Sequence, residues 1–224
     1  MSSFYPILVE LQRKKALVVG GGKVAQRKIE TLLECGAFVQ VVARELTAEL
    51  EELRSWRQIE FLGGEFSEAY LEGAFLVFAA TDDVLLNRRV SQAAQQRGLL
   101  VNAVDQPADC NFIVPSVLTR GDLLIAVSTS GKSPAFARKV RVELERHFGE
   151  EYGLFLSLMG NLRKEILCLG LSQEENKRAF EELVYSDLLP AIREKNWDLA
   201  SQIIQKVLGR PISKNQILEF LKAE

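Results

Sequence analysis

Short apolar runs alternate with segments of helical periodicity through the first half of the chain. Runs rich in β-branched residues predict strands over residues 16–19, 38–43, 59–62, 75–80 and 99–104. Apolar residues at helical spacing predict helices over residues 24–35, 46–56 and 84–97. Strands and helices that alternate in this way are typical of a mostly parallel, doubly wound α/β sheet, in which ligands bind at the carboxyl ends of the strands.

The pattern changes after Asp105. Two apolar runs, residues 112–118 and 123–128, flank a Thr-Arg-Gly-Asp turn and predict a β-hairpin. Ser133 suits the N-cap of the helix that follows, and Pro134 suits its first position.

A glycine-rich turn joins the first predicted strand to the first predicted helix. Its sequence, Val-Val-Gly-Gly-Gly-Lys-Val-Ala, contains Gly20-x-Gly22-x-x-Ala25, a variant of the dinucleotide-binding fingerprint. Glycines let the backbone approach a pyrophosphate, and the N-terminus of the helix offers it free N–H groups. The turn therefore predicts a Rossmann-type nucleotide-binding unit, although a tight turn that binds nothing would use the same residues.

Beyond residue 150 the periodicity predicts helices alone. Ser213 and Gln216, three positions apart, are typical of a capping box at the start of the last one. We therefore expect three domains: a dinucleotide-binding Rossmann domain over residues 1–112, a small α/β segment with an anion-binding loop over residues 113–150, and a helical C-terminal domain over residues 151–224.

The composition limits the classes of partner. The 224 residues are 47% hydrophobic and carry a formal charge of −2, so overall charge does not attract the chain to nucleic acid or to an anionic membrane surface. No apolar run approaches the length of a membrane span, and the N-terminus lacks the pattern of a signal peptide. We therefore expect a cytoplasmic protein that binds neither nucleic acid nor membranes.

Residues that commonly hold metals are few and far apart. Cys35, Cys110 and Cys168 form no Cys-x-x-Cys pair, and His147 is the only histidine. This predicts neither a disulfide framework nor a resident metal, and it places His147 at the solvent edge of a helix. Acid–base chemistry is then left mostly to carboxylates, lysines and hydroxyls.

The second predicted strand ends without the acidic residue that commonly binds the ribose of NAD. Ala43 and Arg44 stand at that position, and Glu45 follows. Arg44 has three possible interpretations: its guanidinium contacts a 2′-phosphate, it stacks on the adenine, or it is simply exposed to solvent. The choice between NAD and NADP therefore stays open on physical grounds.

Two further strand ends carry polar residues. Thr81, Asp82 and Asp83 follow the fourth predicted strand, and one of the two acids is expected to cap the next helix. Asn87 is expected on the surface of that helix or, as the alternative, facing the loop. Asp105 follows the last strand. A partly desolvated carboxyl there would have a raised pKa and would exchange a proton beside a hydride transfer, but an ordinary turn aspartate would occupy the same position.

Residues 128–133, Ser-Thr-Ser-Gly-Lys-Ser, form a second loop of small residues that leads into a helix. Its backbone N–H groups, hydroxyls and lysine suit an anion. No glycine stands five residues before Gly131, so the loop is not a P-loop and ATP is not expected. Arg138 and Arg141 share a face of the helix and suit carboxylates, or else they form a solvated basic face with Lys139.

Six blocks of sequence occur in a distinctive order. They are Tyr5–Ile7, Val18–Lys28, Ala80–Asp83 with Asn87, Asn102–Asp105, Cys110–Ser116 and Ile125–Arg138. Together they resemble the precorrin-2 dehydrogenase family of siroheme synthesis, some members of which also insert iron as sirohydrochlorin ferrochelatases. Ser130 departs from the family pattern, because glycine is common at its position, and the helical region from residue 151 is similar only in general character.

The resemblance implies an NAD-dependent oxidation of precorrin-2 to sirohydrochlorin by a homodimer, in which residues 113–150 pair with the partner chain. It gives Asp105 the role of proton acceptor and, in bifunctional members, of an aid to chelation. Together with the strand-end residues above, it predicts cofactor contacts at Gly20, Gly22, Lys23, Val24, Arg44, Glu45, Thr81 and Asp82. The carboxylate-rich tetrapyrrole is expected to contact Asn102, Ser128, Thr129, Ser130, Gly131, Lys132, Ser133 and Arg138.

Two other functions fit part of the pattern. A regulatory module that senses NAD(H) would use the same N-terminal half and present the helical tail to partners, but it would need neither Asp105 nor the loop at residues 128–133. An enzyme that acts on a different acidic small molecule would bind NAD without turning over a tetrapyrrole. Incubation with NAD and precorrin-2, followed by an absorption spectrum, separates the three.

Overall fold

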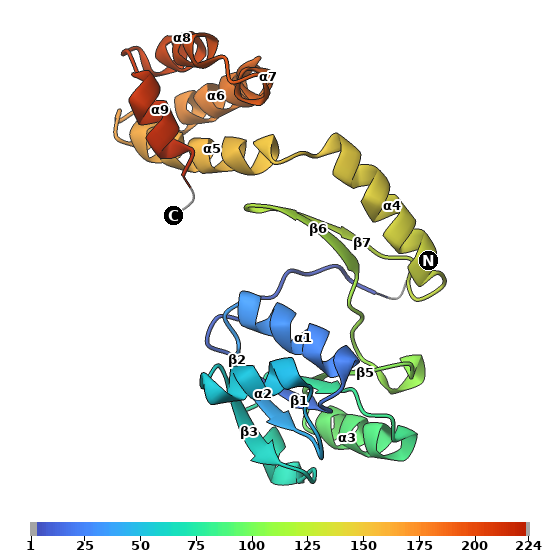
Figure 1. Cartoon of the computed structure of the whole chain (residues 1–224). Coiled ribbons are helices and arrows are strands. Elements are labelled where there is room, and N and C mark those ends of the chain that lie inside the picture. The colour runs from blue at the N-terminus through green and yellow to red at the C-terminus, as the bar shows by residue number, and fades with distance from the viewer. Residues whose placement is uncertain (1–3, 223–224) are drawn as a thin grey trace. The chain divides into compact units, whose positions relative to one another are not determined.

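The computed structural model describes residues 4–222 and consists of two compact units, Met1–Val114 and Pro115–Glu224 (Figure 1). Each unit has a hydrophobic core of its own. The three domains expected from the sequence are a finer division of the chain and stay a prediction.

Parallel strands form the sheet of the first unit. Their order is β3-β2-β1-β4-β5, which is a Rossmann-type order, and it reverses between β1 and β4 (Figure 1). The crevice at such a reversal, outside the carboxyl ends of the strands, is where ligands bind in open α/β sheets. Every strand expected here is confirmed to within one residue at each end: β1 (Lys15–Val19), β2 (Phe38–Val42), β3 (Ile59–Gly63), β4 (Leu76–Ala79) and β5 (Leu100–Ala103).

Helices cover both faces of this sheet, as the alternation along β1 illustrates. Val18 packs into one core with Ile29 of α1, and Leu17 packs into the other core with Val90 of α3. All of these side chains are fully buried, as expected for parallel strands covered on both faces. The helical elements of this unit are α1 (Lys23–Glu34), α2 (Ala48–Ser55), α3 (Val84–Gln96) and the short 3₁₀ helices η1 (Glu68–Leu71) and η2 (Pro107–Asp109).

The outer edge of β5 is paired with an irregular segment that follows η2. The side-chain oxygen of Asn111 accepts a hydrogen bond from Val101 N at 2.8 Å, and Asn111 N donates to Val101 O at 3.1 Å. The amide of Asn102 donates to Phe112 O at 3.1 Å. Because side chains provide part of this pairing, the segment is not a strand, and the strand expected at residues 112–118 begins only at residue 116.

The second unit opens with an antiparallel hairpin and continues as helices. The hairpin consists of β6 (Ser116–Arg120) and β7 (Leu123–Val127), and α4 (Pro134–His147) follows with Ser133 as its N-cap, as expected. The remaining helices are α5 (Glu151–Leu167), α6 (Gln173–Val184), α7 (Leu188–Arg193), α8 (Trp197–Leu208) and α9 (Lys214–Phe220).

The helices from α5 to α9 share one core, with Leu158, Ile204 and Ile217 fully buried. The predicted capping box of Ser213 and Gln216 is confirmed at the start of α9. Among residues 4–222, no helix combines the length and the apolar character that crossing a membrane requires.

Candidate functional site

The glycine turn follows β1, the middle strand of the sheet, and so lies at the middle of the edge formed by the carboxyl ends of the strands. Gly20 has a φ of +131°, and a Cβ on it would collide with the carbonyl group of Ala80. A Cβ on Gly21 would collide with Glu45 O and would lie 2.7 Å from the Cβ of Ala43. The first two glycines therefore let the ends of β1, β2 and β4 meet.

The third glycine faces open space. A Cβ on Gly22 would meet no described atom within 4 Å, and Gly22 is the N-cap of α1 without any side-chain hydrogen bond to the helix. Gly22 therefore offers no side-chain acceptor to the N–H groups in the first turn of α1, which include those of Lys23 and Val24. This arrangement, an uncapped helix N-terminus beside an open glycine, fits a pyrophosphate.

The end of β2 lies beside this turn. Thr47 N donates to Gly21 O at 3.0 Å, and the Thr47 hydroxyl accepts a hydrogen bond from Leu50 N and so caps α2. This cap explains why α2 begins at Ala48, two residues later than expected. The side chains of Arg44 and Glu45 are both exposed at this edge.

Asn87 organises the end of β4. It is 2% exposed, and its side-chain oxygen accepts hydrogen bonds from Thr81 N at 3.1 Å and from the Thr81 hydroxyl at 2.7 Å. Its amide donates to Thr81 O at 2.9 Å. Of the two positions considered for Asn87, the structure therefore shows the one that faces the loop, where three hydrogen bonds compensate the burial of its amide.

The two acids after Thr81 have different positions. The carboxylate of Asp83 accepts hydrogen bonds from Leu85 N at 2.9 Å and Leu86 N at 3.0 Å, so Asp83 is the cap of α3. Asp82 is exposed. The expectation that one of the two acids caps the helix is confirmed, and Asp82 is left as the acid available to a ligand.

Asp105 lies in the turn that follows β5. Its φ is +59°, a left-handed conformation that aspartate tolerates better than most residues do. The residue is exposed, because the turn continues past the buried strand into solvent. Of the two environments considered for Asp105, this is that of a turn aspartate, and its catalytic role stays a prediction. Asn102, one strand position away from the turn, is half-buried and uses its amide to bind Phe112 O.

The predicted anion loop belongs to the second unit, between β7 and α4. The Thr129 hydroxyl donates to Ser133 O at 3.0 Å and accepts from Ser133 N at 3.1 Å, which closes the loop. Ser130 and Gly131 have φ of +53° and +79°. The left-handed φ of Ser130 is the physical reason for a preference for glycine at this position, and Lys132 is exposed at the tip.

The basic residues of α4 differ in their partners. Arg141 forms an ion pair with Glu145, one turn further along the helix, so the expectation that Arg141 joins Arg138 in binding carboxylates does not fit its contacts. Arg138 is exposed. His147 is exposed at the end of α4, as expected.

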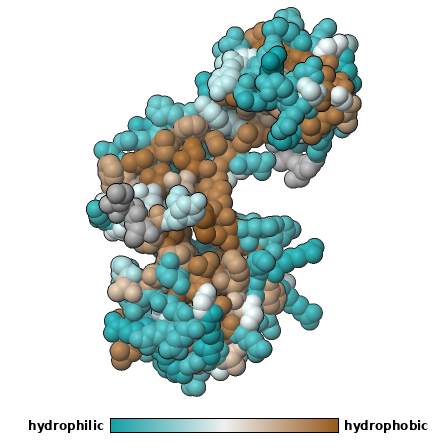
Figure 2. Space-filling model, turned by 180° about the vertical axis from the view of Figure 1, so that it is seen from behind, coloured by the Kyte–Doolittle hydropathy of each residue, from teal (hydrophilic) through white to brown (hydrophobic). Residues whose placement is uncertain are grey.

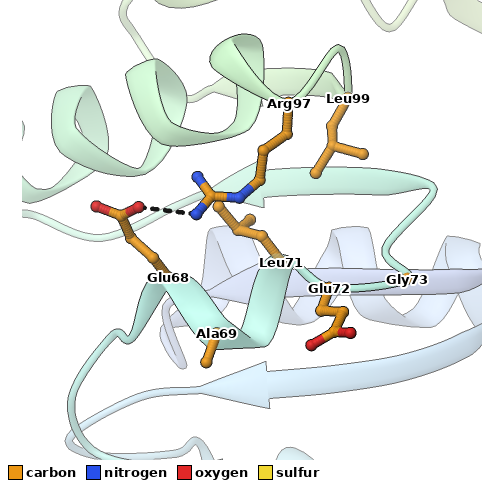
Figure 3. A pocket seen from close by; sticks show the side chains of 7 residues that line it. All are labelled: Glu68, Ala69, Leu71, Glu72, Gly73, Arg97 and Leu99. Carbon is orange, nitrogen blue, oxygen red and sulfur yellow. Dashed lines mark hydrogen bonds and ion pairs between the residues drawn. The ribbon is translucent and has the colours of Figure 1, made fainter.

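A cavity of about 430 Å³ lies away from these residues (Figure 3). Gly73 and Leu99, which line it, precede β4 and β5, so the cavity is at the amino edge of the sheet. Its walls include the ion pair of Arg97 and Glu68 at 2.9 Å, drawn as a dashed line in Figure 3. Open α/β sheets bind ligands at the opposite edge, and we assign this cavity no role.

Comparison with known proteins relates the chain to siroheme synthesis. Residues 7–116 match a family described as putative NAD(P)-binding, and residues 120–147 match one described as sirohaem biosynthesis protein central. A siroheme synthase of Photorhabdus laumondii is 41% identical over 82% of this chain and 39% of its own length. Between them, the two family matches assign residues 7–116 and 120–147 to an NAD(P)-binding family and a sirohaem biosynthesis family, the combination expected of a siroheme-synthesis dehydrogenase.

Other similar proteins are also siroheme synthases or enzymes named for precorrin-2. A siroheme synthase of Sodalis glossinidius is 38% identical over 92% of this chain and 44% of its own length, so the chain spans less than half the length of the curated relatives it matches. The solved structure named "SirC, precorrin-2 dehydrogenase" is 25% identical, superimposes with a TM-score of 0.78, and is matched over 91% of this chain and 98% of that chain.

Sequence reasoning missed three residues that shape the carboxyl edge: Gly21, Asn87 and Cys110. Asn87 had a detectable signal, because it shares helical spacing with Val90 and Ala94, which are buried on α3. Gly21 contacts the end of β2, which is distant in the sequence, whereas Cys110 contacts Ala103 and Gln106, seven and four residues away. Hydropathy periodicity predicts neither set of contacts.

Proposed function

We propose that this chain catalyses the NAD-dependent dehydrogenation of precorrin-2 to sirohydrochlorin, a step of siroheme synthesis. The observation that carries the proposal is the match to the precorrin-2 dehydrogenase named SirC, which extends over 98% of that protein and is not restricted to the nucleotide-binding half. Similarity to siroheme synthases gives the same substrate class.

NAD, when bound, supplies the hydride acceptor, and the residues of the carboxyl edge hold it. The turn at Gly20 and Gly22 would receive the pyrophosphate, and Lys23 and Val24, in the first turn of α1, would offer it their backbone N–H groups. Arg44 and Glu45 contact the adenosine end, because they follow β2. Thr81, whose backbone Asn87 fixes, and Asp82 line the crevice between β1 and β4, where the strand order reverses.

Asp105 is the proton acceptor. Oxidation of the macrocycle removes a hydride, which goes to the cofactor, and a proton, which the Asp105 carboxylate takes. Its exposure leaves it accessible to a substrate, and the turn places it at the same edge of the sheet as the glycine turn, one strand beyond β4.

The substrate is anionic, and its carboxylates need cations and N–H donors. Lys132 and Arg138 are exposed and supply the positive charge. Thr129 and Ser133 act mainly by closing the loop, since their hydroxyl and backbone groups bind each other. The complete set of proposed substrate contacts is Asn102, Ser128, Thr129, Ser130, Gly131, Lys132, Ser133 and Arg138.

The active form is a homodimer that pairs through the second unit. One face of the β6–β7 hairpin contains the buried Leu118, whereas the opposite face exposes Val117, Leu124 and Ala126. Figure 2 shows hydrophobic side chains gathered over the hairpin and α4. An exposed apolar face of this kind is typical of an interaction surface, and a second copy that covers it is the occupant we infer.

The assay mixes purified protein, NAD and precorrin-2, and follows NADH formation together with the absorption spectrum of the tetrapyrrole. We expect both signals to rise together, and Asp105→Ala to abolish them while NAD still binds. NAD binding without turnover of the tetrapyrrole would contradict the proposal and would favour an NAD(H) sensor or an enzyme acting on another acidic molecule.

Iron insertion into sirohydrochlorin, which the family resemblance raises, stays a separate prediction. Within residues 4–222 there is no group of three or more His, Cys, Asp or Glu residues arranged to hold a metal ion. The direct measurement adds Fe²⁺ or Co²⁺ to protein and sirohydrochlorin and compares the rate of metal insertion with that of a mixture without protein.

A further inference from the structure

We propose that Cys110 is a positioning residue for Asp105: its thiol holds the backbone on both sides of that aspartate and thereby sets where the carboxylate points. The catalytic part of this inference rests on the role of Asp105 proposed above. The structural part, a thiol that fixes a turn, stands on the contacts of Cys110 itself.

The Cys110 thiol contacts backbone groups on both sides of the turn. Ala103, the last residue of β5, donates its N–H to Cys110 Sγ at 3.2 Å, and the thiol is also 3.2 Å from Ala103 O. On the far side of Asp105, Gln106 O lies 3.3 Å from the same sulfur. A thiol has one hydrogen to donate, so the two carbonyl oxygens share it while the sulfur accepts from Ala103 N.

Burial keeps this thiol protonated. Desolvation is the main cause that raises the pKa of Cys110, and the nearby negative charge of Asp109 acts in the same direction. A neutral thiol can donate to a carbonyl oxygen, whereas a thiolate cannot. The sulfur is therefore in the protonation state that its three backbone contacts require.

The Asp105 carboxylate has no other restraint among the described residues. No hydrogen bond or ion pair from residues 4–222 reaches it, so the backbone of the turn alone sets where this side chain leaves the chain and which region its carboxylate can reach. That backbone has a φ of +59°, which is unfavourable for a residue with a Cβ and persists where the surroundings impose it. The backbone hydrogen bond from Gln106 N to Ala103 O at 3.3 Å closes the turn, and the contacts of Cys110 with Ala103 and Gln106 reinforce it from both sides.

The residue before Cys110 is anchored independently to α3. Ser91, fully buried, donates its hydroxyl to Asp109 O, and Gln95 donates to the same oxygen at 3.2 Å. Arg88 pairs with the Asp109 carboxylate at 3.3 Å. Cys110 is thus held in place by the helix while its sulfur holds the turn, which makes it a rigid link between α3 and Asp105.

The test compares Cys110→Ala, which removes the thiol, with Cys110→Ser, which keeps a donor and an acceptor. The exposed cysteines provide matched controls, Cys35→Ala and Cys168→Ala. The first measurement is hydrogen exchange at the amides of Ala103 and Gln106. We expect exchange about tenfold faster or more in Cys110→Ala, close to the wild-type rate in Cys110→Ser, and unchanged in both controls.

The second measurement is kinetic. A shift of the reacting carboxylate by about 1 Å costs up to about 100-fold in rate, so Cys110→Ala should lower kcat by about tenfold or more. The Kd for NAD should stay within about twofold, because the glycine turn is not touched. Recovery of kcat in Cys110→Ser would separate positioning from a general loss of structure.

The two measurements distinguish the possible failures. Normal exchange and normal kcat in Cys110→Ala would overturn the inference. Faster exchange with unchanged kcat would overturn its catalytic part. A wild-type protein that does not oxidise precorrin-2 contradicts the proposed function instead, and the exchange data then decide the structural part alone. If Cys110→Ala does not fold, Cys110→Val keeps the apolar volume without the hydrogen bonds and takes its place.

Discussion

Adjacent glycines in the β1–α1 turn have different surroundings, and alanine should separate their roles. At Gly21 the added methyl group would collide with the end of β2, so Gly21→Ala should lower the free energy of unfolding by about 1–3 kcal/mol. Gly22 has a φ of −83° and faces open space, so Gly22→Ala should cost no more than the weaker N-cap preference of alanine, less than about 1 kcal/mol. Denaturant unfolding measures both variants.

The same pair tests the cofactor. If the open space at Gly22 receives the pyrophosphate, the methyl group in Gly22→Ala should weaken NAD binding by about tenfold or more while the protein stays folded, which calorimetric titration measures. Unchanged NAD affinity in this variant would show that the pyrophosphate lies elsewhere.

The two acids after β4 provide a matched pair for the cap of α3. Asp83→Ala removes the acceptor of two backbone N–H groups and should lower the free energy of unfolding by about 1 kcal/mol. Asp82→Ala is the control, since Asp82 is exposed and does not cap the helix, and its unfolding curve should match that of the wild type. Equal loss in the two variants would contradict the assignment of Asp83 as the cap.

At the scale of elements, the sequence predicted strands and helices well where burial is periodic and failed where side chains replace backbone pairing. The strands of the parallel sheet are apolar because both of their faces are covered, so their ends could be placed within a residue. Residues 112–115 are also apolar, yet they pair with the edge of β5 through Asn111 and Asn102 instead of a ladder. Hydropathy does not distinguish these cases.

The start of α6 makes a prediction about pH. Hydrogen bonds from the hydroxyl and the N–H of Ser172 lower the pKa of the Glu175 carboxyl below its ordinary value of 4.5. A lowered pKa in the folded state means that this carboxylate stabilises the fold above pH 4.5 and loses the effect as pH falls through the folded value. Ser172→Ala should therefore lower Tm at neutral pH, and the difference should shrink in acid.

Circular dichroism melting curves over this pH range check the prediction, with Glu175→Gln as the control. Glutamine keeps a capping acceptor without the charge, so the Tm of Glu175→Gln should approach that of the wild type as pH falls through the lowered folded pKa of Glu175. A Tm difference between Ser172→Ala and the wild type that stays constant with pH would show that the Glu175 charge does not contribute.

At the scale of the whole molecule, the candidate site could be predicted only in part. The glycine turn was found because consecutive glycines after an apolar run indicate a tight turn. Asp105 was found because it directly follows an apolar run that predicts a strand. The exposure of Asp105, the link through Cys110 and the burial of Asn87 depend on how the loops fold back, since Cys110 contacts Gln106 four residues away and Asn87 contacts Thr81 six residues away. Two units with separate cores also place the nucleotide-binding turn and the predicted anion loop on different parts of the chain.

The open face of the hairpin gives the last prediction, which concerns assembly. If a second copy covers Val117 and Leu124, then a charge at the centre of that face must be buried without a partner on association, which is costly. Leu124→Glu should therefore convert the dimer to a monomer, as measured by light scattering after size exclusion. Tyr185→Glu is the control, because Tyr185 is 86% exposed at the end of α6 and should leave the dimer intact. A wild-type monomer, or a Leu124→Glu dimer, would rule out this interface, and loss of dehydrogenase activity together with the dimer would indicate that catalysis needs both copies.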